Sequence, residues 1–394
     1  MAHFFTFNQN SFMKTKLFLL AATLIGVFSS CLKDETTTLT RNYTPEEFEK
    51  VSKHLNLPVE VDDYTLALPM TLSGFPVQVD NKQATLGRVL FYDKRLSVNG
   101  EVNCASCHKA ELAFTDGEQF SKGVTEERTS RNTLALGSFP SFNAYYGFGG
   151  TRMFWDNRVA SVIEQSAETM KNPIEMGNVD LANLADELVK EEYYDVLFKK
   201  AFPNQDWMTN EEKMLQALQT FVSSIGCFNS KYDKALIDEN GNNAAQFSKF
   251  TAQENQGKQL FNQHCANCHN LGAGFATTIV AANNGLDLDY ADEGMGAISN
   301  VSTENGLFKV PMLRNIELTA PYMHDGRFAT LEQVVEHYSS GVKNHPNLHP
   351  ELKSGNLPKQ LDLDTNEKQA LVAFLKTLTD SESLSSVRYS DPFK

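Results

Sequence analysis

Basic residues are scarce in this 394-residue chain. It has 35 lysine and arginine residues against 49 aspartate and glutamate residues, which gives a formal net charge of −14. A nucleic-acid partner would require a basic surface, so this balance excludes that class of function. A basic or neutral redox partner suits an acidic protein better, because opposite charges attract. The length suits about two or three domains.

Cysteines able to form a structural disulfide are lacking as well. Four of the six stand in two copies of the pentapeptide Cys-x-x-Cys-His, at residues 104–108 and 265–269. Cys31 ends a stretch that is typical of an export signal. Cys227 stands alone among small and apolar residues, and we expect a buried, unreactive thiol there. Disulfides therefore say nothing about the redox compartment of this protein.

The repeated pentapeptide is typical of covalent c-type haem attachment. Two thiols on one short turn can each add to a vinyl group of the porphyrin, and the next histidine can ligate the iron through a neutral imidazole. A thioredoxin-like disulfide would need a βαβ context, and a shared zinc site would leave a histidine unused beside each pair. We therefore expect two covalently bound haems, and an exported protein, because c-type attachment takes place outside the cytoplasm. The predicted attachment residues are Cys104, Cys107, Cys265 and Cys268, and the predicted proximal iron ligands are His108 and His269.

No stretch approaches the length of a transmembrane helix. The apolar run Leu17–Phe28 is about as long as a signal-peptide core. It follows two lysines after Met13 and ends just before Cys31, which resembles a bacterial lipoprotein signal. We therefore expect the true start at Met13, a signal peptide over residues 1–30, a lipid on Cys31 and a polar tether over residues 31–44. The body would then be lipid-anchored in the cell envelope, on the periplasmic side or at the cell surface.

Runs that alternate apolar and polar residues are missing, so a strand-rich fold is not expected. Helix starts are marked instead by capping boxes, in which Ser or Thr is followed three residues later by Glu or Gln. Such boxes begin at Thr209, Thr251 and Thr330, and Asn366–Thr379 carries an apolar stripe on one helical face. The sequence therefore predicts an all-α fold.

A short internal repeat divides this helical body. Gly87–Phe91 precedes the first pentapeptide, and Gly257–Phe261 precedes the second. A glycine one turn before Leu-Phe suits a helix that packs closely against another helix. Both copies resemble the N-terminal helix of a cytochrome c domain, and Asn366–Thr379 resembles its C-terminal partner. We predict two cytochrome c-type domains, over residues 45–240 and 241–394, each with one haem.

A long segment rich in glycine and aromatic residues lies between the two pentapeptides. It runs from Phe139 to Gly150 and continues through Thr151–Arg158. Loops this long in a compact domain are usually functional or disordered, and the aromatic content argues against disorder. A simple electron-carrying cytochrome does not need such a segment.

Histidine is absent between His108 and His264. No residue of that segment can therefore supply a second imidazole to the first iron. A histidine such as His54 or His324 would have to come from elsewhere in the chain. Three methionines of the segment are candidate thioether ligands, although methionine in such a helix more often fills the core. They are Met153, Met170 and Met176. The pattern favours a first iron with an open or weakly held sixth position, as in a haem catalyst.

Three polar residues are spaced ten apart within this segment: Trp155, Gln165 and Glu175. Gln165 falls within a predicted helix, and Glu175 falls on the loop after Pro173. Heterolysis of a peroxide needs a base that takes a proton from one oxygen and returns it to the other. A carboxylate in an apolar pocket can do so if its pKa is raised. The alternative is a surface glutamate and a helix-surface glutamine.

The second iron has two candidate sixth ligands. Met323 lies in the stretch Ala320–Gly326, and Tyr338 lies on the helix that begins at Thr330. The helical spacing of Leu331 and the apolar residues after it predicts that Tyr338 faces inward and that His337 does not. The alternatives are a core tyrosine and a gap-filling methionine.

These motifs, in this order and spacing, resemble the bacterial di-haem cytochrome c peroxidases and their MauG-type relatives. The resemblance covers most of the chain after about residue 45. It rests on both pentapeptides, Phe154–Asp156, Gln165, Asn172–Met176, Leu313–Asn315 and Ala320–Gly326.

The resemblance implies a role for each matching residue. Cys104, Cys107 and His108 would hold the peroxide-reacting haem, and Cys265, Cys268 and His269 the electron-transferring haem. Glu175 would be the acid–base residue, Gln165 its hydrogen-bonding partner, and Trp155 would lie on the electron path between the haems. Asn132, with the backbone carbonyls of Thr319 and Pro321, would bind one calcium ion, which suits ligation by oxygen atoms.

Two departures from the peroxidase pattern matter. Peroxidases carry a histidine shortly after the first haem motif, but residues 118–127 contain none. Peroxidases also place a methionine fourteen residues after the histidine of the His-Asp-Gly motif. Counting from His324 gives Tyr338, the residue that MauG-type enzymes use, so Tyr338 is preferred over Met323. Both departures imply a first haem that is open without prior reduction.

Three functions follow from these patterns. The first is a peroxidase that reduces hydrogen peroxide with electrons from a small donor, such as a monohaem cytochrome c or a cupredoxin. The second is a MauG-type enzyme that oxidises residues of a partner protein. The third is a non-catalytic di-haem electron carrier, which would leave the polar residues near the first haem without a task. A homodimer is a common state for such proteins.

Overall fold

The computed structural model describes residues 42–65, 79–137, 152–269, 271 and 280–394. The chain divides between Thr40 and Arg41, and all that follows concerns the part after this division. The predicted signal peptide, Met13, Cys31 and most of the tether lie outside the described residues, as does the segment Phe139–Gly150. No helix of the described ranges is both long and apolar enough to cross a membrane.

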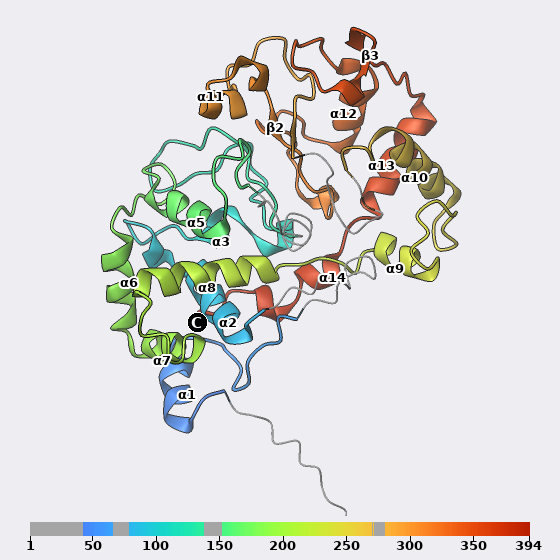
Figure 1. Cartoon of the computed structure of the whole chain (residues 1–394). Helices are drawn as coiled ribbons and strands as arrows, with labels where there is room; N and C mark the ends of the chain where they lie inside the picture. Colours follow the sequence, from blue (N-terminus) through green and yellow to red (C-terminus); the bar gives the residue numbers. More distant parts are fainter. Residues whose placement is uncertain (1–41, 66–78, 138–151, 270, 272–279) are drawn as a thin grey trace, which may run out of the picture. The chain divides into compact units, whose positions relative to one another are not determined.

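Helices dominate the described part of the chain (Figure 1). The α-helices are α1 (Pro45–Ser52), α2 (Asn81–Tyr92), α3 (Cys104–Cys107), α5 (Val162–Lys171), α6 (Leu181–Val189), α7 (Glu192–Ala201), α8 (Asn210–Ser224), α9 (Lys231–Asp238), α10 (Ala252–His264), α11 (Met295–Ser299), α12 (Leu331–Glu336), α13 (Thr365–Lys376) and α14 (Ser381–Leu384). Short 3₁₀ turns are η2 (Lys94–Leu96), η3 (Ala110–Leu112), η4 (Ser302–Glu304), η5 (Ile316–Leu318), η7 (Pro350–Leu352) and η8 (Val387–Tyr389), and η6 (His337–Gly341) is a π-helical segment.

Strands within these ranges are two residues long. They form two antiparallel pairs: β1 (Ala281–Ala282) with β2 (Phe308–Lys309), and β3 (Lys353–Ser354) with β4 (Leu357–Pro358).

The predicted capping boxes are confirmed as helix starts. The side chains of Thr209, Thr251 and Thr330 each accept a hydrogen bond from the backbone N–H three residues on. In return, the Glu or Gln side chain at that position accepts a bond from the backbone N–H of the threonine. These begin α8, α10 and α12. Local sequence therefore determines where three helices of the two haem regions start.

The two glycines of the internal repeat each sit at a close helix crossing, as predicted. A Cβ atom built on Gly87 of α2 would lie 2.0 Å from the carbonyl oxygen of Ala217 in α8, and one built on Gly257 of α10 would lie 1.9 Å from that of Ala370 in α13. Only a residue without a side chain allows backbones to approach this closely. The α10–α13 pair is visible side by side in Figure 1. The helix pairs α2–α8 and α10–α13 thus share the same close packing at a glycine.

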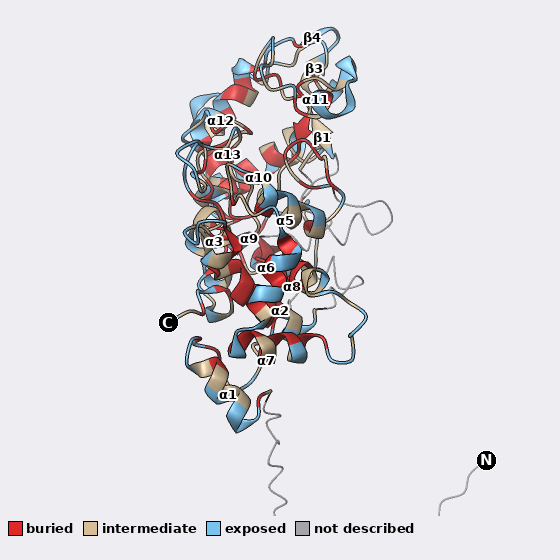
Figure 2. Ribbon diagram, turned by 90° about the vertical axis from the view of Figure 1, so that its left-hand side faces the viewer, coloured by how far each residue is buried: buried red, intermediate tan, exposed pale blue. Residues whose placement is uncertain are grey.

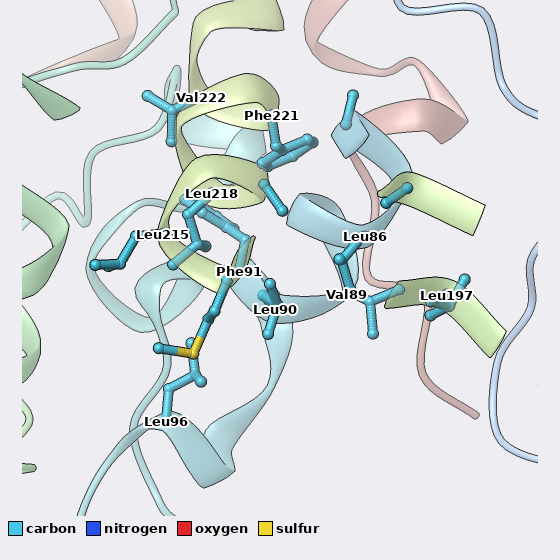
Figure 3. Packing of buried hydrophobic residues seen from close by; sticks show 14 of the residues in the cluster. Leu86, Val89, Leu90, Phe91, Leu96, Leu197, Leu215, Leu218, Phe221 and Val222 are labelled. Carbon is cyan, nitrogen blue, oxygen red and sulfur yellow. The ribbon is translucent and has the colours of Figure 1, made fainter. Parts of the chain in front are cut away.

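Buried apolar residues form two clusters. The first is built on the α2–α8 pair, and Figure 3 shows Leu90, Leu218 and Phe221 packed within it. The second is built on the α10–α13 pair, with Phe261 and Phe374 at its centre. Buried positions on these helices are red in Figure 2.

The clusters separate in sequence between Cys227 and Tyr232, and Leu384 and Tyr389 near the C-terminus belong to the first. The chain therefore returns to its first cluster after it has built the second. The predicted domain boundary at residues 240 and 241 stays a prediction.

Candidate active site

The first Cys-x-x-Cys-His motif forms a single helical turn. Helix α3 spans Cys104–Cys107. At its start the Asn103 side chain accepts a hydrogen bond from the Ser106 hydroxyl at 3.0 Å and donates to the Tyr92 carbonyl. His108 follows directly, and its Nδ1 lies 2.7 Å from the carbonyl oxygen of Phe114. Burial lowers the pKa of His108. A neutral ring that donates from Nδ1 keeps Nε2 free for a metal, which is how protein ligands to iron are usually oriented.

The second motif repeats this arrangement at the end of α10. His269 places Nδ1 3.0 Å from the carbonyl oxygen of Pro311, and burial lowers its pKa to about 4. The thiols of Cys265 and Cys268 stand on the same turn, and burial raises their pKa values. In both motifs a neutral imidazole and two thiols are held together, so the residues present fit a covalently bound haem.

A mostly apolar cavity adjoins the second motif. Its wall includes His269, Cys265 and Cys268 of the motif, together with Met323, Tyr338 and Asn284. The same cavity reaches Asn132 and Trp155, which lie between α2 and α8 in the sequence. The cavity therefore connects the second motif with residues predicted to lie between the two haems.

Both candidate sixth ligands of the second iron line this cavity, and both contact the side-chain amide of Asn284. The Nδ2 atom of Asn284 donates to the Tyr338 hydroxyl at 3.4 Å and to the Met323 sulfur at 3.5 Å. Burial raises the pKa of Tyr338 to about 12. The inward position predicted for Tyr338 is confirmed, but the choice between the two ligands stays a prediction.

The outward position predicted for His337 is wrong. Its side chain is only 6% exposed, and Nε2 lies 3.0 Å from the Asn284 carbonyl oxygen. The reason is contact with other parts of the chain: the His337 ring meets the Asn284 carbonyl, and its centroid lies 5.7 Å from that of the Phe328 ring. Helical spacing assigns His337 to a flank of the helix, but it cannot show that residues distant in sequence cover that flank.

Glu175 lies on the loop after α5, as predicted, and its carboxylate is largely enclosed. Asn172 Nδ2 donates to Glu175 Oε1 at 3.1 Å. Burial raises the pKa of Glu175 above its usual value, although a hydrogen bond from Thr169 and the charge of Arg158 act in the other direction. The pKa of Cys107 in the first motif is raised mainly by burial, and the nearby negative charges of Asp116 and Glu175 raise it further. The Glu175 carboxylate therefore lies near the first motif.

The loop that lacks histidine packs directly on this glutamate. The backbone nitrogen of Val124 donates to the carbonyl oxygens of Ile174 and Glu175, at 3.0 and 3.1 Å. A Cβ atom built on Gly123 would lie 1.9 Å from the Ile174 oxygen. Gln165 lies on α5, and no described contact joins its side chain to Glu175. The structure thus places Glu175 in a defined loop and leaves the partnership with Gln165 as a prediction.

Trp155 is nearly buried, with 9% of its surface exposed. Its indole Nε1 donates to the Asn132 carbonyl at 2.8 Å, and its own carbonyl accepts from the Lys309 backbone nitrogen at 2.7 Å. The Lys309 ammonium donates to the Arg152 carbonyl at 2.7 Å. Lys309, from β2, therefore holds the Trp155 turn at two points.

The residues predicted to bind calcium line one cavity. Asn132, Thr319 and Pro321 all contribute to its wall. The Asn132 amide nitrogen donates to the Glu118 carbonyl at 2.9 Å, so its oxygen is the atom left to face a cation. Across the described ranges, no group of three or more His, Cys, Asp or Glu side chains could hold a metal. The calcium site rests on amide and carbonyl oxygens and stays a prediction.

The methionines and the lone cysteine serve the core. Met153, Met170, Met176 and Cys227 are all buried in the first apolar cluster. This agrees with the core-filling interpretation of each. Among the histidines outside the segment, His54 stacks on Tyr193 and His324 stacks on Phe308.

Comparison with known proteins identifies the family. A family model described as di-haem cytochrome c peroxidase matches residues 81–241. The methylamine utilization protein MauG of Paracoccus denitrificans is 30% identical over 358 residues, which cover 76% of this chain and 89% of that protein. The cytochrome c551 peroxidase of Nitrosomonas europaea is 30% identical over 309 residues, 76% of this chain and 80% of that protein.

The chain belongs to the di-haem cytochrome c peroxidase and MauG family. A crystal structure of a MauG-like protein associated with microbial copper homeostasis superimposes with a TM-score of 0.68 at 32% identity, covering 84% of this chain and 98% of that chain. The di-haem peroxidase BthA of Burkholderia thailandensis, at 21% identity and a TM-score of 0.60, shares the fold. The all-α prediction is confirmed, and membership in this family implies two c-type haem domains.

Sequence reasoning missed three residues of the site. Asn284 contacts both candidate ligands, and Lys309 donates to the carbonyl of Arg152 near Trp155. Arg131 pairs with Asp292 and with Asp156, the residue next to Trp155. Asn284 sits in an Asn-Asn-Gly turn that reads as an ordinary loop. A buried lysine carries no local signal either, so only the fold could identify these residues.

Proposed function

We propose that this di-haem protein is a peroxidase that reduces hydrogen peroxide to water with electrons from an external small redox protein. Electrons would enter at the haem held by Cys265, Cys268 and His269. They would pass Trp155 to the haem held by Cys104, Cys107 and His108, where peroxide reacts. The relatives named as peroxidases and the acidic charge of the chain, which suits a basic or neutral donor, support this proposal.

The haems, when bound, supply the redox chemistry that no amino-acid side chain offers. The chain's own task at the first haem is proton transfer. The Glu175 carboxylate would take the proton from one peroxide oxygen and return it to the other, which leaves as water. Gln165 would orient the peroxide by a hydrogen bond. Tyr338 would occupy the sixth position of the second iron, with Met323 as the alternative.

One observation carries this proposal: Glu175 is an enclosed carboxylate with a raised pKa beside the first haem motif. An enclosed acid of raised pKa suits general acid–base work near neutral pH. The absence of histidine between His108 and His264 supports it, since nothing in that segment can block the first iron with an imidazole.

Replacing this carboxylate tests the proposal. In Glu175→Gln, turnover should fall by roughly a hundredfold or more, measured as peroxide-dependent oxidation of a reduced cytochrome c. Glu164→Gln is the matched control, because Glu164 is an exposed glutamate on α5 that only accepts a bond from the Ala160 backbone. Wild-type turnover in Glu175→Gln would reject the assignment of Glu175.

A MauG-type oxidation of a partner protein is the second candidate function. The inward Tyr338 supports it, as do MauG relatives at 30% identity. A peroxidase should turn over rapidly with small reduced donors. A MauG-type enzyme should instead be slow with them and should modify a partner protein when peroxide is added. An oxidised protein with two low-spin haems that do not react with peroxide would reject both in favour of an electron carrier.

We also propose that the protein is anchored in the cell envelope by a lipid on Cys31 and that calcium binds at Asn132, Thr319 and Pro321. Palmitate labelling tests the anchor, and a Cys31→Ala protein that stays in the membrane fraction would reject it. Calcium removal by a chelator should alter electron transfer between the haems, and Asn132→Ala should reproduce that change.

A further inference from the structure

Asn284 lines the cavity beside the second haem motif. Its side-chain Nδ2 lies 3.4 Å from the Tyr338 oxygen and 3.5 Å from the Met323 sulfur. One amide group thus contacts both side chains that are candidate sixth ligands of the second iron. The contact also requires that the oxygen and the sulfur lie near each other.

The backbone around Asn284 is fixed by the same helix that carries Tyr338. The Asn284 carbonyl lies 3.0 Å from His337 Nε2, and the next residue, Gly285, has a positive φ of +68°. In an α-helix, adjacent residues such as His337 and Tyr338 point about 100° apart. Both nevertheless reach Asn284, His337 at its backbone carbonyl and Tyr338 at its side-chain amide, and a π-helical segment begins at His337. π-helical turns of this kind occur often at functional sites.

Asn284 is further held from its own side of the cavity. Its neighbour Asn283 is fully buried, and its side chain meets the His345 ring at 3.2 Å and the Tyr290 hydroxyl at 3.3 Å. The Asn284 amide is therefore a fixed donor rather than a mobile surface group.

We propose that Asn284 is a positioning residue that assigns Tyr338, and not Met323, to the second iron. This inference rests on the proposed second haem site. A phenol oxygen bound to ferric iron carries negative charge and accepts a hydrogen bond strongly, whereas a thioether sulfur is a weak acceptor. A fixed N–H donor near both groups therefore favours the oxygen as ligand. Without the donor, the affinity of iron for the phenol oxygen falls relative to its affinity for the thioether sulfur. The change favours sulfur most for reduced iron, which prefers softer ligands.

The test compares ligation of the second haem in the oxidised holoprotein. Asn284→Leu removes the donor, and Asn284→Asp keeps the size but replaces the donor with a carboxylate that repels a phenolate. Both should shift the ratio of tyrosine to methionine ligation at least about tenfold toward methionine, the size expected for losing a hydrogen bond to a charged acceptor. Resonance Raman modes of the iron-bound phenolate and the near-infrared thioether band measure the two forms.

Met323→Leu is the matched control, since it removes the competing sulfur and should leave the phenolate signal of the wild type unchanged. In Asn284→Asp combined with Met323→Leu, the thioether band should vanish. Unchanged phenolate ligation in both Asn284 variants would overturn the proposal, and so would thioether ligation in the wild type. Failure of the proposed peroxidase function is a separate result, because turnover with peroxide is measured on the wild type and does not enter these spectra.

Discussion

Burial sets the acid–base properties of Glu175. Its carboxylate accepts a hydrogen bond from Asn172, and the loop of residues 118–127 packs on its backbone. Its pKa is raised because burial disfavours the charged form. A carboxylate used as a base must nevertheless lose its proton. Ionisation of Glu175 therefore lowers the folding stability of the protein, and the same ionisation makes the carboxylate a base.

The pH dependence of turnover should reveal the raised pKa of Glu175. Peroxide turnover should be constant near neutral pH and should fall as the pH is lowered through the raised pKa of Glu175, because the protonated carboxyl cannot accept a proton. The measurement is kcat/KM for peroxide against pH. Glu164→Gln should keep the wild-type profile, and a profile that does not change across the acid range would contradict the assignment.

The contribution of Glu175 to the free energy of unfolding should change with pH in the opposite direction to turnover. A folded-state pKa above the unfolded value means that the stability from this group is present at low pH and is lost as pH rises through the folded pKa. Glu175→Gln should therefore be as stable as the wild type at neutral pH, or more stable, in urea unfolding. A variant that is inactive because it is unfolded would fail this measurement.

At the scale of elements, two helix pairs depend on a glycine at their closest approach. Gly87 lies against Ala217 and Gly257 against Ala370. The backbones meet so closely that no neighbouring side chain can yield to make room. Each crossing should therefore be sensitive to the smallest added group.

Gly257→Ala should destabilise the protein by roughly 1–3 kcal/mol or more, since its Cβ would lie 1.9 Å from the Ala370 oxygen and force α10 and α13 apart. Urea unfolding of the holoprotein measures the loss. Gln256→Ala is the control, because Gln256 is exposed on the same helix and alanine favours helices. Equal stability of the two variants would show that the helices can separate without cost.

At the scale of the whole molecule, Arg131 joins segments far apart in the sequence. It binds Asp292 through two nitrogens, at 2.7 and 2.8 Å, and it also pairs with Asp156 beside Trp155. Burial alone would raise the pKa of Asp292, but the bonds from Arg131 and the Gly294 amide lower it. The ion pair thus connects the Trp155 turn with the region after the second haem motif.

Asp292→Asn should lower the free energy of unfolding by roughly 1–2 kcal/mol at neutral pH, through loss of a partly exposed, charged hydrogen-bonded pair. Because the folded-state pKa of Asp292 is lowered, its stabilisation is present above the unfolded value and is lost as pH falls through the folded value. The difference between variant and wild type should therefore shrink in acid. Asp289→Asn, at an exposed position, should show neither effect.

The sequence by itself determined the features that depend on neighbours along the chain. The two haem motifs, the capping boxes at Thr209, Thr251 and Thr330, and the glycines of the repeat follow from covalent spacing and helix geometry, which local residues control. The same holds for the loop position of Glu175 after Pro173.

Only the tertiary structure decided which groups meet inside the cavity. Helical spacing predicted an outward His337, but the turn that carries Asn284 meets its ring, and the side chain is buried. Asn284, Lys309 and Arg131 gained their places through contacts with residues distant in sequence. Such contacts depend on how packed helices and loops meet, and no local pattern of residue types records that arrangement.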